Sequence, residues 1–334
     1  MFNKIKYPAL NAKMKGMYTK NLNKDELDEL LRQSNLKEAI SILKSKFPNL
    51  ENVSENTSRM ELEQELNNLF IDNIIKLSKY LNKDEKELFM LFLSKYEINI
   101  VKNVYRNVTT NRDSNRYLKN VNSWTSRLFK GIDGINNVQT EEEFLKIIKS
   151  QDYSYIFEEY KKDDKEIPLE ELEVKLDKYY FKNLYEAIEQ KNNELMDIIG
   201  TEIDLLNITW IYRANKYFEY SFDEIKEILI PITYKLNKNI IKELINANEF
   251  EEMKTIIQKT YYKKVFTEEL YIEHDINQYL YSKYIKYFKE ELFNICTIFC
   301  DINLIDIEAK NIVNIIEGIR YDLDKTEIQK RIII

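Results

Sequence analysis

The apolar residues of this sequence recur at helical spacing over most of its length. In the stretch 169–190 they fall three or four positions apart, and Pro168 stands where a first-turn proline opens a helix. The stretch 36–47 has the same periodicity and ends at Pro48. Pro231 interrupts a further helical pattern, and its missing N–H predicts a turn or kink there. The pattern therefore predicts a succession of helices.

Capping residues mark where several of these helices begin. Ser58 with Glu61, and Thr140 with Glu143, form capping boxes in which a hydroxyl and a carboxylate each accept a hydrogen bond from an orphan N–H. The predicted connections are short and rich in asparagine, at 49–56, 111–115, 131–137 and 161–165. None of them resembles a flexible tether between independent domains.

The composition supports an all-α fold. Only 5 glycines and 4 prolines occur in 334 residues. Sandwiches, barrels and doubly wound α/β folds need many tight turns, and tight turns need these residues. The glycines are also too few and too scattered to form GxxxxGK[ST] or GxGxxG, so we predict no nucleotide-phosphate cradle.

The sequence contains few of the residues that catalytic and metal-binding sites need. His274 is the single histidine, which argues against an HD-type or HExxH metal centre and against a metal-dependent hydrolase. Cys296 and Cys300 lie four residues apart in an apolar stretch, a spacing typical of buried reduced thiols rather than of a disulfide. We predict no catalytic residue, no cofactor and no metal site, and hence a protein that is not an enzyme.

Charge is unevenly distributed along the chain. The net charge of −7 argues against nucleic-acid binding, and no run of 18 apolar residues predicts a membrane span. The start has no apolar secretory segment, so we expect a cytoplasmic protein. Residues 1–24 nevertheless contain no acid and six lysines: Lys4, Lys6, Lys13, Lys15, Lys20 and Lys24. This stretch is either a solvated arm or a basic patch near anionic lipid or an acidic partner.

Two patterns recur three times in the same order. The first opens with an acid, at Glu97, Asp204 and Glu308, and places β-branched residues four and seven positions later. The second is a short apolar helix around positions 42, 147 and 256. We interpret the chain as three similar helical bundles of about 105 residues, with boundaries at 1–115, 116–222 and 223–334. Three such units are expected to close around a pseudo-threefold axis as a funnel.

Several polar residues accompany the repeated acids. Asn207 and Asn311 follow their acids by three positions and share the same helix face. Arg106 and Arg213 point to the opposite face, and the third unit has Arg320 nearby. One interpretation is that an acid in the first turn and an arginine in the last turn complement the helix macrodipole. The alternative is that the arginines contact a neighbouring lobe or a partner.

These motifs resemble the C-subunit family of V-type/A-type ATP synthases, whose vacuolar member is called the d subunit. The start Tyr7-Pro-Ala-Leu-Asn11-Ala12-Lys13-Met-Lys15 is similar to that family's Y-x-x-x-N-A-R/K-x-R/K. The segments 202–213 and 308–320 are similar to its acid-x-x-N-[IL] helices. Ile100 departs from the pattern where the second unit has Asn207, and lysines stand where the family often has arginines.

The resemblance implies a funnel of three helical lobes in the central stalk of a rotary ATPase. Such a protein connects the D and F stalk subunits to the membrane proteolipid ring (the c-ring), transmits torque for proton or sodium transport, and leaves ATP chemistry to the A and B subunits. It is peripheral to the inner face of the membrane, which gives Lys4, Lys6, Lys13 and Lys15 a membrane-proximal role. The alternative is a helical adaptor of another cytosolic complex.

Overall fold

All regular elements in the described part of the chain are helices, as the sequence predicts. The computed structural model describes residues 8–18, 21–110, 128–129, 131–132, 134–161, 169–189, 192–218, 220–290 and 295–334. Within these ranges no strand occurs. The all-α prediction is therefore confirmed.

The chain divides into two compact units. The first unit comprises residues 1–89, 113–137 and 284–334, so it contains both the beginning and the end of the sequence. Its elements are α1 (Pro8–Tyr18), α2 (Lys24–Arg32), α3 (Leu36–Lys46), α4 (Arg59–Ile75), the 3₁₀ turns η2 (Lys76–Tyr80) and η3 (Ile135–Asn137), α16 (Ile295–Arg320) and α17 (Lys325–Gln329).

The second unit comprises residues 90–112 and 138–283. The helices α5 (Lys83–Thr109) and α15 (Ile272–Lys289) each run from one unit into the other. The remaining elements are α8 (Glu141–Ile148), α9 (Tyr155–Lys161), α10 (Leu169–Ile188), α11 (Asn193–Arg213), the π turn η4 (Ala214–Phe218), α12 (Phe222–Ile228), α13 (Lys238–Ile245), α14 (Phe250–Ile257) and the 3₁₀ turn η5 (Glu269–Tyr271). The three-unit division at 115 and 222 stays a prediction.

Polar caps fix the starts of the helices. The Ser58–Glu61 capping box is present, and Asn23 and Ser221 open α2 and α12 in the same way. At α8 the Thr140 hydroxyl accepts the N–H of Glu143 as predicted, but the Glu143 carboxylate accepts the N–H of Gln139 instead of that of Thr140. Each cap satisfies donors that the first helical turn leaves free.

The prolines act where the sequence predicts. Helix α3 ends at Lys46, two residues before Pro48, and α12 ends at Ile228, three residues before Pro231. Pro168 lies outside the described residues, and α10 begins directly after it.

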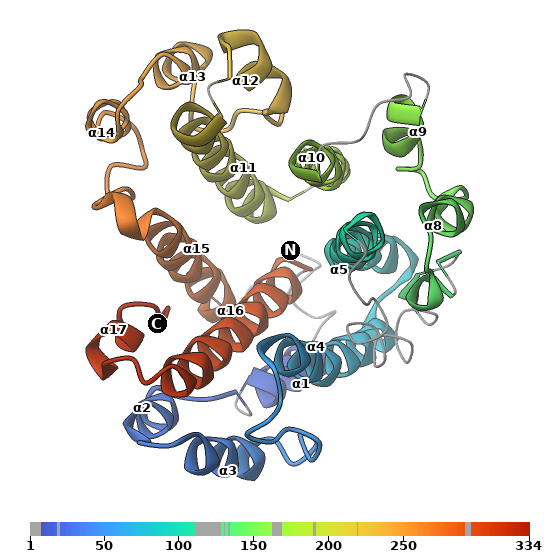
Figure 1. Ribbon diagram of the computed structural model, residues 1–334, viewed down its shortest axis with the longest axis vertical. Coiled ribbons are helices and arrows are strands. Elements are labelled where there is room, and N and C mark those ends of the chain that lie inside the picture. The colour runs from blue at the N-terminus through green and yellow to red at the C-terminus, as the bar shows by residue number, and fades with distance from the viewer. Residues whose placement is uncertain are drawn as a thin grey trace. The chain divides into compact units, whose positions relative to one another are not determined.

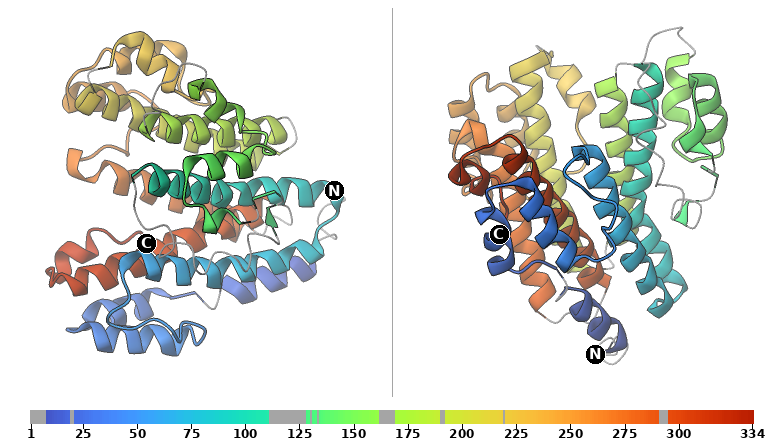
Figure 2. Two further views of the ribbon diagram at one scale, coloured as in Figure 1. Left: turned by 45° about the vertical axis from the view of Figure 1, so that its right-hand side comes forward. Right: turned by 60° about the horizontal axis from the view of Figure 1, so that its bottom comes forward.

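Each unit is built around one long buried helix. In the first unit α16 packs along α4 and also contacts α1, α2 and α3 (Figure 1). Figure 2 shows from two further directions that α4 and α16 lie side by side. In the second unit α11 is covered by α10, α12 and α13. Because α11 and α16 are surrounded, their polar residues must find partners inside the protein.

Candidate functional site

The three repeated acids lie in the middle of long helices. Glu97 is in α5, Asp204 in α11 and Glu308 in α16, each more than two turns from the helix start. The interpretation that these acids lie in a first turn and complement the helix macrodipole is therefore wrong. The apolar stretches before them continue the same helix, so the acids are buried core residues with exposed fractions of 9%, 0% and 7%.

Asp204 has the most complete set of hydrogen-bond donors. Its two carboxylate oxygens accept the backbone N–H groups of Tyr234, Lys235 and Leu236, at 2.9, 2.6 and 3.1 Å. Oδ2 also accepts the hydroxyl of Tyr262 at 2.7 Å. We call this carboxylate with its donors the Asp204 site. It ties the segment before α13 and the segment after α14 to the middle of α11.

The other two acids are bound by fewer donors. Glu97 accepts the hydroxyl of Tyr153 at 2.7 Å, so a tyrosine after the short helix α8 has the role that Tyr262 has after α14. Glu308 accepts the backbone N–H of Leu22 at 2.6 Å through Oε1, whereas its buried Oε2 has no hydrogen-bond partner among the residues described. The carboxylate of Glu308 with the N–H of Leu22 is called the Glu308 site below.

Burial raises the pKa of all three acids. For Glu97 the Tyr153 hydroxyl partly opposes this effect of burial, and for Asp204 its four donors do so. For Glu308 burial raises the pKa to about 8, opposed only by the N–H of Leu22 and by Lys46. The same burial and the adjacent carboxylates raise the pKa values of the Tyr153 and Tyr262 hydroxyls, so both remain protonated donors.

The two predicted asparagines make the same contact in different helices. Asn207 accepts the N–H of Ile230 at 2.9 Å and donates to its carbonyl at 3.1 Å. Asn311 accepts the N–H of Ile333 at 2.9 Å and donates to its carbonyl at 2.8 Å. Each side chain therefore satisfies the backbone N–H and C=O of one residue, as a paired strand would, and fixes an irregular segment to a core helix.

The predicted arginines lie in the last turns of their helices, and each contacts a neighbouring segment. The guanidinium of Arg106 donates to Glu173 of α10, and that of Arg213 donates to Glu273 of α15. Arg320 donates to the carbonyls of Glu55 and Thr57 and to the Glu317 carboxylate at 2.8 Å. Neither Arg106 nor Arg213 pairs with the repeated acid of its own helix.

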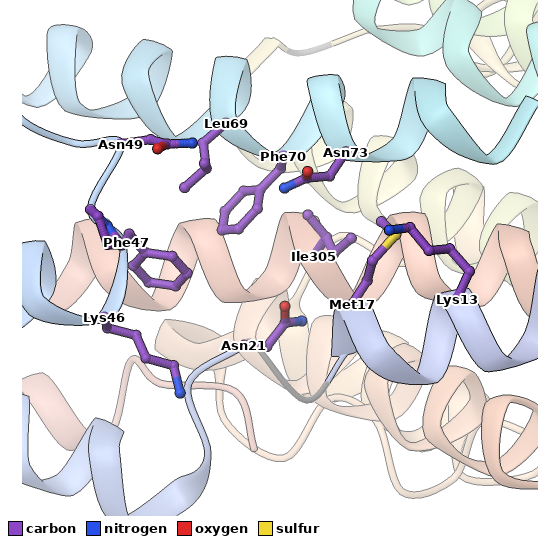
Figure 3. A pocket seen from close by; sticks show the side chains of 11 residues that line it. Lys13, Met17, Asn21, Lys46, Phe47, Asn49, Leu69, Phe70, Asn73 and Ile305 are labelled. Atoms are coloured by element: carbon purple, nitrogen blue, oxygen red, sulfur yellow. The ribbon is translucent and has the colours of Figure 1, made fainter.

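A cavity of 530 Å³ opens in the first unit between α1, α4, α16 and the end of α3 (Figure 3). Its walls combine apolar side chains such as Phe70 and Ile305 with the amide of Asn21 and the lysines Lys13 and Lys46. Lys13 and Lys15 are exposed on α1. Lys4 and Lys6 lie outside the described residues.

Comparison with known proteins decides the family. The family model described as ATP synthase (C/AC39) subunit matches residues 10–331, which is nearly the whole chain. The chain belongs to this family. The resemblance seen in the sequence motifs is therefore confirmed.

Curated relatives of this family member share one designation, the C subunit of an A-type ATP synthase. That of Pyrococcus furiosus is 23% identical over 264 residues, covering 78% of this chain and 69% of the relative. That of Methanothermobacter thermautotrophicus is 19% identical over 274 residues, covering 79% and 68%. That of Thermococcus kodakarensis is 25% identical over 231 residues, covering 67% and 61%.

The side chains of this family member form a structural network in its described part. No group of three or more His, Cys, Asp or Glu side chains is placed to hold a metal ion within the ranges described. His274 Nδ1 lies 3.8 Å from a carboxylate oxygen of Asp275, and Cys296 and Cys300 are buried and not joined in a disulfide. None of the helices described has both the length and the apolar character needed to cross a bilayer.

Sequence reasoning missed the donors that complete the acid sites. Tyr153 and Tyr262 follow the last buried isoleucines of α8 and α14, Ile148 and Ile257, by five positions in both cases. This recurrence was available as a signal. The backbone N–H donors at 234–236 could not be predicted in this way, because nearly every residue type has a backbone N–H.

Proposed function

We propose that this chain is a non-catalytic central-stalk (rotor) subunit of a V-type/A-type rotary ATPase. In this proposal it connects the D and F stalk subunits to the membrane proteolipid ring and transmits torque for proton or sodium transport. The observation that supports it is the family match over residues 10–331 together with relatives named as the C subunit of A-type ATP synthases.

The mechanical part of the proposal rests on how the helices are tied together. A torque-bearing connector must not deform between its two ends, and this chain fixes its irregular segments to its long helices. The bonds made by Asp204, Asn207 and Asn311 each hold a segment more than twenty residues away in sequence. The three-lobed funnel, with units at 1–115, 116–222 and 223–334, is part of the same proposal.

The proposal assigns roles to the remaining candidate residues. Arg106, Arg213 and Arg320 fix the C-terminal ends of the long helices through the contacts described above. The lysines Lys4, Lys6, Lys13 and Lys15 lie toward anionic lipid in this arrangement. The protein is then peripheral to the inner face of the membrane.

Reconstitution of the enzyme in vesicles with and without this chain tests the proposal. Without it, we expect ATP hydrolysis by the catalytic subunits to continue while ion transport stops, and adding the chain back should restore transport. The chain should also copurify with the D and F stalk subunits in the absence of the ring. Transport that persists without the chain, or a chain that binds neither these stalk subunits nor the ring, would contradict the proposal.

A further inference from the structure

The Glu308 site and the Asp204 site are built from corresponding residues. Leu22 donates its N–H to Glu308 and Leu236 donates its N–H to Asp204, and each leucine directly precedes the asparagine that caps the next helix. Two turns before these acids, on the same helix face, α16 has Asp301 and α11 has Asp197. The two sites can therefore be compared residue by residue.

In the second unit the aspartate two turns before Asp204 is neutralised. The Asp197 carboxylate accepts the Lys235 ammonium at 2.6 Å, the Lys283 ammonium, and the hydroxyl of Tyr234 at 3.1 Å. Two positive charges thus lie against this carboxylate, and a tyrosine hydroxyl and three N–H groups bind the next one, Asp204.

In the described part of the first unit, the positions that correspond to these lysines carry no cation. Asn21 precedes Leu22 where Lys235 precedes Leu236. Phe70 of α4 and Tyr279 of α15 are corresponding residues, because each makes the ring contact described below. One turn further along, α15 has Lys283 whereas α4 has Ile74. Both lysines are therefore replaced by uncharged residues.

The tyrosine hydroxyl is missing as well. By position in the sequence, Pro48 corresponds to Tyr262, because the same number of residues separates Pro48 from Leu22 as separates Tyr262 from Leu236. The ring contact of Tyr262 with Tyr279, at 6.0 Å between centroids, is made here by Phe47 with Phe70, at 5.9 Å. Neither Phe47 nor Pro48 carries a hydroxyl.

Two carboxyl groups are left without these partners inside the protein. Asp301 is 0% exposed, and among the residues that the structure describes neither of its oxygens has a hydrogen-bond partner, nor does Oε2 of Glu308. Ile305 lies between them on α16, one turn from each, and lines the 530 Å³ cavity together with Asn21, Phe47 and Phe70 (Figure 3). The cavity therefore opens onto Ile305, on the face of α16 that carries both carboxyl groups.

We propose that Asp301 and Glu308 form a proton-binding site, in which bound protons replace the two lysines and the tyrosine hydroxyl of the second unit, and that proton release loosens α1 and α2 from α16. A buried carboxyl can avoid an uncompensated charge by keeping its proton. When both protons leave, two negative charges share one buried helix face and must be hydrated. The N–H of Leu22 lies in the segment that joins α1 to α2, so hydration of Glu308 acts on the contact that holds them.

Burial favours the protonated form of both carboxyl groups. Burial raises the pKa of Asp301 to about 7 with no other group contributing, and Glu308 is raised to about 8. The charged groups that act on Glu308 are Lys46 of α3, Glu26 of α2, which itself binds Lys46 at 2.6 Å, and Asp301. The residues buried on the elements packed against α16 near this face are apolar: Met14 and Met17 on α1, and Ile71 and Ile74 on α4. Lys13 of α1 is exposed and lines the 530 Å³ cavity together with Ile305, and Lys15 is also exposed on α1. The charged residues of α17 belong to the opposite end of α16, near Gly318.

Hydrogen exchange of the full chain between pH 6 and pH 9 tests the proposal. After correction for the intrinsic exchange rate, we expect the protection of α2 and α16 to fall as the pH rises to about 8, by up to about tenfold per pH unit for each proton released, and to level off above that. The double variant D301N/E308Q should show no such dependence, because its amides mimic the protonated carboxyls. Asp306→Asn, on the same helix at a less buried position, is the matched control and should keep the dependence.

Two further measurements keep the test decisive if the double variant folds poorly. Infrared spectra of the unaltered chain should show protonated carboxyl groups at pH 6 that disappear above pH 8. Ile74→Lys should remove the pH dependence by supplying a cation at the position of Lys283. A wild-type chain with pH-independent protection and no protonated-carboxyl signal overturns the proposal, as does a wild-type slope retained in D301N/E308Q.

Discussion

Asn207 and Asn311 each bind the backbone N–H and C=O of one residue in a segment more than twenty residues further along the chain. Both side chains are almost fully buried, at 1% and 3% exposure. Replacing either asparagine by alanine leaves a buried N–H and C=O without partners. We expect a cost of about 1–3 kcal/mol for each variant, measured by urea unfolding. Asn277→Ala is the control, because its exposed amide binds within its own helix, and an equal loss there would contradict the assignment.

The hydroxyl of Tyr262 can be removed without changing the ring contact. Phe47 shows that a phenylalanine ring packs in the same way in the first unit. Tyr262→Phe should lower stability by about 1–2 kcal/mol at neutral pH, because it removes one of the donors that lower the pKa of Asp204.

The pH dependence of Tyr262→Phe follows from the sign of that shift. The pKa of Asp204 is already higher in the folded chain than in the unfolded chain, and the variant raises it further. Stability is then lost as the pH rises from the unfolded value, about 4, through the folded value. The loss caused by Tyr262→Phe should therefore shrink as the pH approaches about 4. The neighbouring Tyr261→Phe, at 73% exposure, should change stability little at any pH.

At the scale of the element, two helix-interior glycines mark close approaches. A Cβ at Gly200 would lie 2.5 Å from the ring of Tyr234, and one at Gly318 would lie 2.5 Å from the side chain of Ile328. Gly318→Ala should therefore destabilise the packing of α17 on α16 by about 1–3 kcal/mol, although alanine is the better helix former.

A double-variant comparison separates the contact from helix propensity. Ile328→Ala in the background of Gly318→Ala should cost less than Ile328→Ala alone, since both changes act on one contact. Gly16→Ala is the matched control, because nothing lies within 4 Å of its added Cβ. That control should raise stability by up to about 1 kcal/mol in thermal unfolding. Additive effects of Gly318→Ala and Ile328→Ala would show that the glycine is not needed for this contact.

Helix positions were predictable because capping and proline signals are local. Ser58, Pro48 and Pro231 act within a few residues of where they stand, so the sequence alone places the helix ends. The full length of α16 was not evident, because its buried aspartate at 301 and the aspartate at 306 interrupt the apolar run in the sequence while the helix continues. A polar residue within an apolar run does not reveal whether the helix ends there or continues with the polar group buried.

At the scale of the whole molecule, the repeats predicted three corresponding acidic positions but not the groups that donate hydrogen bonds to them. The recurrence of Glu97, Asp204 and Glu308 identified three corresponding positions. Their partners come from segments distant in sequence: Tyr153, the 234–236 backbone and Leu22. The last of these contacts joins α16 to a segment 286 residues earlier, so spacing along the chain could not predict it.

The beginning and the end of the sequence are tied together in the first unit. Besides the bond from Leu22 to Glu308, the Lys325 ammonium donates to the carbonyl of Arg32 at 2.6 Å. Ile333 binds Asn311, and Ile328 packs on Gly318. Ending the chain after Arg320 removes the last three of these contacts at once and leaves the second unit unaltered in sequence.

Hydrogen exchange on this shortened chain shows whether the two units depend on each other for stability. We expect α2 and α16 to lose at least tenfold in protection, because a buried amide and an apolar face of α16 lose their cover. Helix α11 should keep its protection, since the donors to Asp204 and Asn207 all lie within its own unit. Tyr321→Ala and Leu323→Ser, exposed positions in the removed stretch, serve as controls and should leave both helices unchanged. An equal loss of protection in α11 and α16 would instead mean that the whole chain unfolds as one cooperative body.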